Sequence, residues 1–69
     1  MPDKAVIGCR IKNLREKAGL SQQELANLVG VDRSTIAMYE AGQRIPRDDT
    51  KKKLSENLGE SIENIFFAS

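Results

Sequence analysis

The stretch SQQELANLVGVDRSTIAMYEA, residues 21–41, constrains the fold of this chain more than any other. Apolar residues recur in it at the spacing of an α-helix, stop at Gly30, and then resume at helical spacing. They are Leu25, Ala26 and Val29 before the glycine, and Val31, Ile36 and Tyr39 after it. Gly30 suits a left-handed turn, which a Cβ would disfavour. The pattern predicts two short helices, over about 22–29 and 33–40, joined by a tight turn.

Polar residues mark the start of both helices. Ser21 and Glu24 have the Ser-x-x-Glu spacing of a capping box, in which each side chain accepts a hydrogen bond from the backbone of the other. Asp32 stands where it can cap the second helix.

The segments on either side also have helical signals. An inward apolar stripe predicts a first helix from about 4–8 to Lys17, ended by Gly19 and weakened early by Gly8. The stripe consists of Ile7, Ile11, Leu14 and Ala18. Pro46 interrupts the chain before a predicted helix over 48–58.

Ser61 is expected to open a last short helix. No stretch alternates with period two for long enough to predict a strand. We therefore expect one all-α domain over 1–69, a compact bundle of five short helices. With 69 residues, it should bury only about 60% of its unfolded surface.

This pattern resembles the helix-turn-helix of phage-repressor and Cro-type (Xre-like) transcriptional regulators. The resemblance covers about 7–67, places the motif at 22–41, and includes Arg15, the pair Tyr39-Glu40 and the Arg-x-Pro at 44–46. It implies a lambda-repressor-like domain that binds double-stranded DNA and regulates transcription. We expect a repressor that binds a palindromic operator as a homodimer, with the helix over about 33–40 in the major groove.

The outer side of that helix supplies the candidates for reading bases. They are Arg33, Ser34, Thr35 and Met38. A guanidinium can bind guanine O6 and N7 bidentately, so Arg33 is the first choice, and a phosphate-bound or solvated arginine is the alternative. Met38 can contact a thymine methyl or simply lie exposed at the groove wall.

Phosphate contacts are expected from the helix starting at Gln22, whose amide holds a phosphate in similar proteins. Those proteins commonly carry asparagine where this chain has Ala41, so Gln43 and Arg44 are candidates to replace that contact. Arg10 and Lys12 are weaker candidates, with solvated charge as the alternative. The resemblance also pairs Arg15 with Glu40 in a structural ion pair.

Charge is polarised along the chain although its net value is only +1. Basic residues gather in 10–17 and 44–53, whereas the segment after Leu54 carries three glutamates and no base. This layout favours one cationic face, and ordinary solvated helix faces are the alternative.

Apolar residues are concentrated near the carboxyl end. They are Ile62, Ile65, Phe66 and Phe67. We expect Ile62 and Phe66 to complete the core and Ile65 and Phe67 to remain for a second copy of the chain. The alternative is that all four belong to the core of the monomer.

Other function classes have less support. One cysteine, Cys9, and no histidine make no metal site, and no catalytic constellation or cofactor motif is present. No membrane segment or small-molecule ligand is implied, and a single thiol fits a cytoplasmic protein. The rival function is a protein-interaction module, such as an antitoxin or an accessory protein with the same fold.

Overall fold

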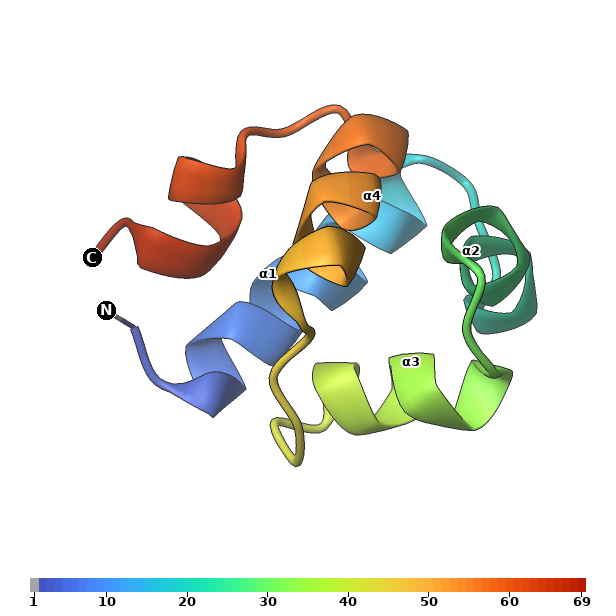
Figure 1. The fold of residues 1–69 in the computed structure, drawn as a ribbon, viewed down its shortest axis with the longest axis horizontal. Helices are drawn as coiled ribbons and strands as arrows, with labels where there is room; N and C mark the ends of the chain where they lie inside the picture. The colour runs from blue at the N-terminus through green and yellow to red at the C-terminus, as the bar shows by residue number, and fades with distance from the viewer. Residues whose placement is uncertain (1) are drawn as a thin grey trace.

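The computed structural model describes residues 2–69 as a bundle of helices, shown in Figure 1. The elements are α1 (Lys4–Lys17), α2 (Gln22–Val29), α3 (Arg33–Glu40), α4 (Asp48–Leu58) and a single π-helical turn, η1 (Glu63–Phe67). No strand occurs between Pro2 and Ser69. The all-α fold class is confirmed, and α1 begins at Lys4, the early limit of its predicted range.

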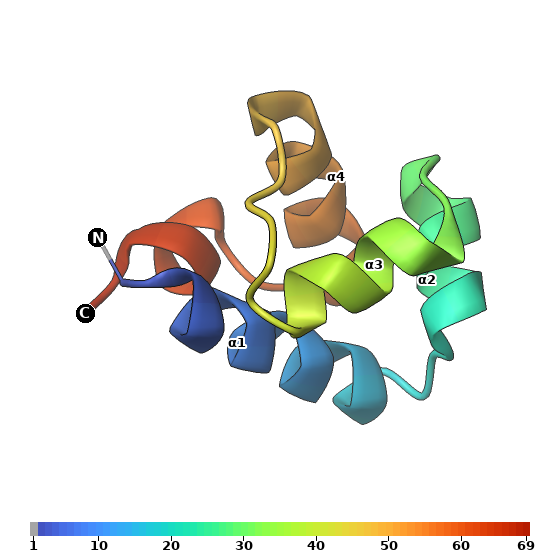
Figure 2. The ribbon, with the colours of Figure 1, turned by 90° about the horizontal axis from the view of Figure 1, so that it is seen from below.

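The helices surround one core. α3 packs against both α1 and α2, α4 packs against α2, and η1 lies on α1. Figures 1 and 2 both show η1 beside the first turns of α1, so segments from opposite ends of the described chain are neighbours. All five elements contribute buried apolar residues. These are Ile7, Ile11, Leu25, Ala26, Val29, Ile36, Tyr39, Leu54, Leu58, Ile65 and Phe66.

The helix ends follow most of the predicted signals. The capping box is present, with Glu24 N–H donating to Ser21 Oγ at 3.0 Å and Ser21 N–H donating to Glu24 Oε1 at 2.9 Å. Gly30 ends α2 in the left-handed conformation, at φ 75°. Asp32 occupies the N-cap position of α3, but its side chain makes no capping hydrogen bond, so that part of the prediction is wrong.

Ala18 is a second correction. It was expected in the inward stripe of the first helix, but it is exposed. It stands just beyond the last residue of α1, where its backbone N–H closes the final turn.

Gly8 allows α1 to cross the end of α3 at very short range. A Cβ built on Gly8 would lie 2.5 Å from the carbonyl oxygen of Tyr39 and 2.6 Å from that of Glu40. Both neighbours are backbone atoms, so no side-chain rotation can relieve such a contact. A residue that looks like a weak point of the helix is thus required by the packing.

The carboxyl-terminal turn differs from the expected α-helix. Ser61 precedes it and its Oγ accepts from Asn64 N–H at 3.1 Å, but Ala68 N–H bonds to Glu63 O five residues back. This wider turn reduces the rotation between neighbours, so that Ile65 and Phe66 both face the core. The prediction that Ile65 remains for a partner is therefore wrong.

Candidate nucleic-acid interface

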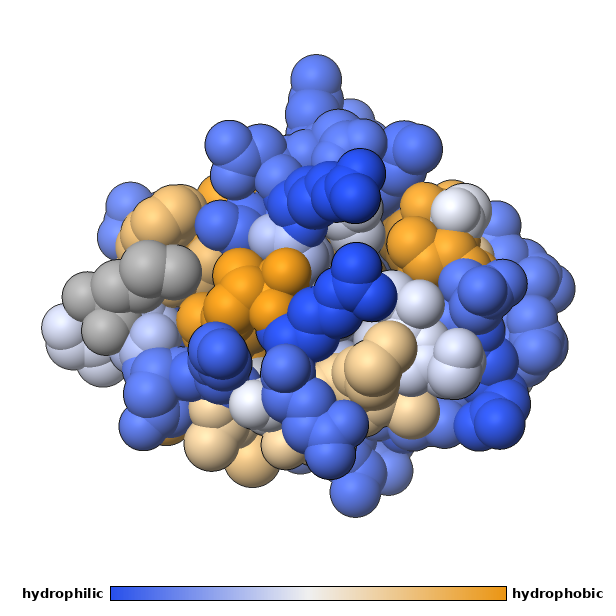
Figure 3. Space-filling view, turned by 60° about the horizontal axis from the view of Figure 1, so that its bottom comes forward, coloured by the Kyte–Doolittle hydropathy of each residue, from blue (hydrophilic) through white to orange (hydrophobic). Residues whose placement is uncertain are grey.

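α3 presents one side to the core and the other to solvent. Ile36 is fully buried and Tyr39 is 4% exposed, whereas Arg33 and Ser34 in the first turn are exposed. Met38 is half-buried on the same helix. Figure 3 shows that the face of the molecule brought forward there is mostly hydrophilic, with separate apolar areas. The amino-terminal turn of α3 is thus free to approach another molecule.

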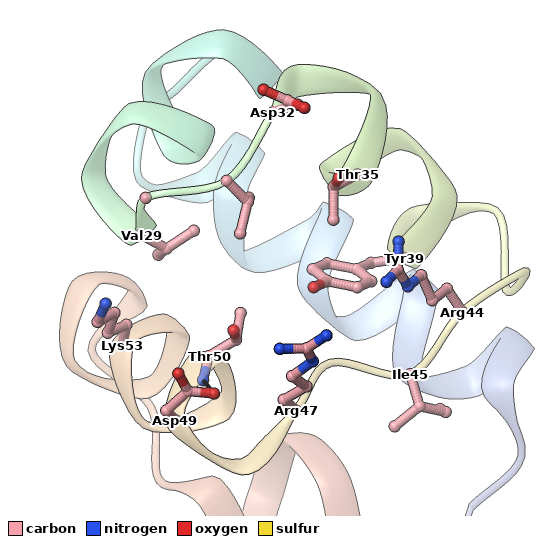
Figure 4. Close-up of a pocket in the computed structure, with 12 residues that line it drawn as sticks. Val29, Asp32, Thr35, Tyr39, Arg44, Ile45, Arg47, Asp49, Thr50 and Lys53 are labelled. Atoms are coloured by element: carbon pink, nitrogen blue, oxygen red, sulfur yellow. Dashed lines mark hydrogen bonds between the residues drawn. The ribbon is translucent and has the colours of Figure 1, made fainter.

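Thr35 lies differently from the other candidates for reading bases. It is half-buried and lines a cavity between α3 and α4, as Figure 4 shows. Arg33, Ser34 and Met38 do not line that cavity. The four candidates therefore share a helix, but only Thr35 belongs to the cavity beside α4.

Glu40 joins three helices. Arg15 on α1 donates to it twice, from Nε to Oε2 at 2.6 Å and from Nη2 to Oε1 at 3.1 Å. The hydrogen bond to Glu40 raises the pKa of Arg15 above its ordinary value, although burial opposes this. Arg15 also donates to the carbonyl of Leu20 at 2.8 Å. The predicted ion pair is present, and it joins α1 and the loop before α2 to the end of α3.

Gln22 extends this network to the start of α3. Its Nε2 donates to Glu40 Oε1 at 3.1 Å, and its Oε1 accepts from Arg33 Nη1 at 3.5 Å. A primary amide nitrogen carries two hydrogens, so one remains for a phosphate. Gln22 and Arg33 are separate candidates in the sequence, and their contact with each other cannot be predicted there, because they stand eleven residues apart.

The predicted phosphate-binding residues lie in three places. Gln43 and Arg44 are exposed on the loop after α3, and Lys12 is exposed on α1. Arg10 is committed elsewhere, since its Nη1 donates to the carbonyls of Asn64 at 3.1 Å and Ile65 at 3.2 Å. The prediction that Arg10 contacts a phosphate therefore has no support, because those bonds hold its guanidinium against η1.

Lys51 and Arg47 were overlooked as individual residues, although both fall within the basic segment 44–53. Lys51 is only 9% exposed and its Nζ lies 5.5 Å from the Phe66 ring and 5.3 Å from the Phe67 ring. Arg47 lines the cavity beside α3. The density of basic residues in this segment is the signal in the sequence that could have identified them. Only the fold shows that Lys51 lies against two phenylalanine rings and that Arg47 lies at the cavity.

The described part of the chain has neither a membrane-spanning helix nor a cluster of metal ligands. None of its helices has the length and apolar character needed to cross a membrane. Within residues 2–69, no three His, Cys, Asp or Glu side chains gather as a metal site would require. Cys9, the one cysteine, is exposed.

Comparisons with known proteins agree with this geometry. The family model described as helix-turn-helix matches residues 11–65. The chain is 38% identical over 53 residues to the cryptic phage CTXphi transcriptional repressor RstR of Vibrio cholerae, a match that covers 77% of this chain and 48% of that one. It is 40% identical over 57 residues to an uncharacterized HTH-type transcriptional regulator of Archaeoglobus fulgidus, covering 83% and 80%.

Among solved structures, the restriction-modification controller protein C.AhdI of Aeromonas hydrophila is similar, with a TM-score of 0.83 and 37% identity. That match covers 90% of this chain and 94% of the other. The chain spans between 17% and 48% of the length of the first three curated relatives it matches. Because the family model and a relative of similar length both cover most of the sequence, this chain belongs to the helix-turn-helix family of DNA-binding transcriptional regulators.

Proposed function

We propose that this regulator represses transcription by binding a palindromic operator as a homodimer, with the first turn of α3 in the major groove. The observation that carries the proposal is the exposure of Arg33 and Ser34 at the start of a helix whose other side is buried at Ile36 and Tyr39. A helix of this kind fits the major groove of B-DNA, and its amino-terminal residues approach the base edges most closely.

The proposed division of roles follows from position. Arg33, Ser34 and Met38 contact bases, and Thr35 contacts a base or a phosphate at the edge of the interface. Gln22, Gln43, Arg44 and Lys12 contact phosphates, which position the protein without specifying sequence. The repressor role is supported by similarity to RstR, whose name describes a transcriptional repressor.

The homodimer is proposed to form through a terminal surface, defined here as the accessible sides of Ile62 and Phe67. Phe67 is 42% exposed although it is large and apolar, and Ile62 is half-buried. Two-fold dimers are the commonest way in which soluble proteins cover such a surface. Ile65 and Phe66 take no part, since both are fully buried within one copy.

In vitro selection of bound DNA from a random pool tests the proposal. We expect an enriched site of two inverted half-sites whose centres lie about 34 Å apart, one helical turn. Affinity for that site should fall steeply with salt, since each neutralised phosphate releases counterions. Recovery of an unrelated or asymmetric set of sequences would contradict the palindromic dimer.

The second candidate is a protein-interaction module with the same fold. It is favoured by the exposed Phe67 and by Ala41, which has no side-chain amide with which to bind a phosphate. A gel-shift assay with the promoter of its own gene and competitor DNA separates the two functions. Loss of the shifted band with any competitor DNA would support the interaction module.

A further inference from the structure

A cavity of about 470 Å³ lies between α3, the turn that precedes it, and the first half of α4 (Figure 4). This volume falls within the range of about 300–1,000 Å³ typical of small-molecule sites. Most of the side chains that line it are polar, so the cavity suits a polar ligand better than an apolar one.

Two largely buried residues contribute hydroxyl groups to this cavity. Tyr39 is 4% exposed and Thr50 is 8% exposed, and both line it. Figure 4 shows the Tyr39 ring with its oxygen directed into the cavity, and no hydrogen bond joins that oxygen to another lining residue. Within residues 2–69 neither hydroxyl has a hydrogen-bond partner, and neither oxygen is sealed from solvent. Both hydroxyl groups can therefore donate to and accept from a molecule that enters the cavity.

Positive charge surrounds the hydroxyl groups. Arg44, Arg47 and Lys53 line the cavity, and none of them forms an ion pair with a carboxylate of the described chain. Figure 4 shows the Arg47 guanidinium projecting between Tyr39 and Thr50. The amino-terminal end of α4 adds the partial positive charge of the helix dipole. The cavity thus offers cationic donors together with two neutral hydroxyl donors.

Two acidic residues restrict the chemistry of the ligand. Asp32 and Asp49 also line the cavity, so its formal charge is only +1. The Asp49 Oδ1 accepts from Thr50 N–H at 3.0 Å, which leaves its second oxygen available. A ligand that carries both an anionic group and hydroxyl groups would satisfy the donors and the free carboxylate oxygens together.

We propose that this cavity binds a small organic phosphate. The phosphate oxygens accept hydrogen bonds from the Tyr39 and Thr50 hydroxyls and pair with the Arg47 guanidinium, a charge-assisted contact with two parallel donors. Hydroxyl groups elsewhere on the ligand donate to Asp49 and Asp32. No small-molecule ligand is expected from the sequence, because the residues that line the cavity meet only when α3 and α4 pack.

A consequence for DNA binding rests on the proposed function. Asp32 occupies the N-cap position of α3 and Thr35 lies within α3, and both residues line the cavity. A phosphate bound there adds negative charge beside the helix proposed to enter the major groove. We therefore expect the ligand to lower operator affinity.

Amide chemical shifts of the ¹⁵N-labelled full chain, titrated with ribose 5-phosphate in the absence of DNA, test the site. Ionic strength is held constant with sodium chloride, and ribose serves as the neutral control. We expect saturable shifts at Tyr39, Arg47 and Thr50 with the phosphate and none with ribose. Because no DNA is present, failure of the proposed function would leave this result unaffected.

Variants show whether the shifts come from the cavity. Y39F removes one hydroxyl and R47Q removes one exposed cation, and each should weaken binding at least about tenfold. The matched control K52Q removes an exposed cation of α4 that does not line the cavity, and its binding should match the original chain. If Y39F does not fold, the loss of binding in R47Q still tests the site.

Three results would overturn the proposal. The first is the absence of saturable shifts up to about 10 mM ribose 5-phosphate. The second is binding that K52Q and R47Q weaken equally, which would indicate charge attraction alone. The third would show that the cavity binds only the DNA backbone. In that case Y39F would lower operator affinity while ribose 5-phosphate failed to bind the free protein.

Discussion

The guanidinium of Arg15 lies against the carboxylate of Glu40, with Nε 2.6 Å from Oε2 and Nη2 3.1 Å from Oε1. Their side chains are only 11% and 4% exposed, so each charge has little contact with water and is stabilised by the opposite charge of its partner. The pair connects α1 to the last residue of α3, and Gln22 links the same carboxylate to Arg33. The residue proposed to read bases is thereby connected to a buried contact within the fold.

Replacing Glu40 with alanine should destabilise the protein strongly. Loss of one partner of a buried pair costs about 3–5 kcal/mol, because the remaining charge is left unpaired. A domain of this size has a total stability of the same order, about 0.05–0.15 kcal/mol per residue. Urea denaturation followed by circular dichroism measures the change, and R15A/E40A should be less unstable than the sum of the single variants. Unchanged stability in E40A would mean that the pair contributes nothing.

Replacing Gly8 with alanine should also destabilise the fold. Alanine gains about 1 kcal/mol of helix propensity, but its Cβ would overlap the carbonyl oxygens of Tyr39 and Glu40. Overpacking against backbone atoms typically costs about 1–3 kcal/mol, so we expect a net loss and a lower melting temperature. C9A is the matched control, because the next residue of the same helix is exposed. Equal melting temperatures for the two variants would show that α1 can move away from α3 without cost.

Replacing Arg33 and Gln22 should affect DNA binding in different ways. R33A should lose about 1–3 kcal/mol of discrimination at one base position in each half-site. Q22A should weaken binding to all sequences by similar factors, because it removes a phosphate contact. Competition assays with single-base operator variants measure both effects. If R33A keeps the base preference of the original chain, another residue reads that position.

Glu24 should make stability depend on pH in a defined direction. Hydrogen bonds from the Ser21 backbone N–H and hydroxyl lower the pKa of Glu24 below its ordinary value of 4.5. The unfolded chain therefore binds more protons as the pH falls through this region. The stabilising effect of Glu24 should be complete above about pH 4.5 and lost as the pH falls through the lower folded pKa.

The difference in unfolding free energy between the original chain and E24Q isolates this effect. Other carboxyl groups titrate alike in both proteins, and glutamine does not titrate. Urea denaturation of both proteins between pH 3 and pH 7 measures the difference. A difference that stays constant over this range would contradict the lowered pKa.

Replacing Phe67 with alanine should weaken the proposed dimer. A large apolar side chain at the centre of an interface commonly contributes enough that its truncation raises the dissociation constant by tenfold or more. L28A is the matched control, because Leu28 is 51% exposed but lies on α2, away from the terminal surface. Sedimentation equilibrium measures both variants. If F67A dimerises like the original chain and L28A does not, the interface lies on α2 instead.

The order and the bounds of α2 and α3 follow from the sequence alone. The spacing of Leu25, Val29 and Ile36, the Ser21 cap and the break at Gly30 are local signals, and local hydrogen bonds and side-chain periodicity decide short helices. The exposed first turn of α3 and the inward direction of Tyr39 follow from the same periodicity.

Tertiary structure alone decided which residues act together. Gly8 is required because α1 crosses the α3 backbone, Arg10 bonds to carbonyls more than fifty residues away, and Ile65 turns inward because the last turn is wider than an α-helix. The same holds for Tyr39 and Thr50, which meet at one cavity. Contacts between residues distant in sequence depend on how helices pack, and helix periodicity contains no information about which faces will meet.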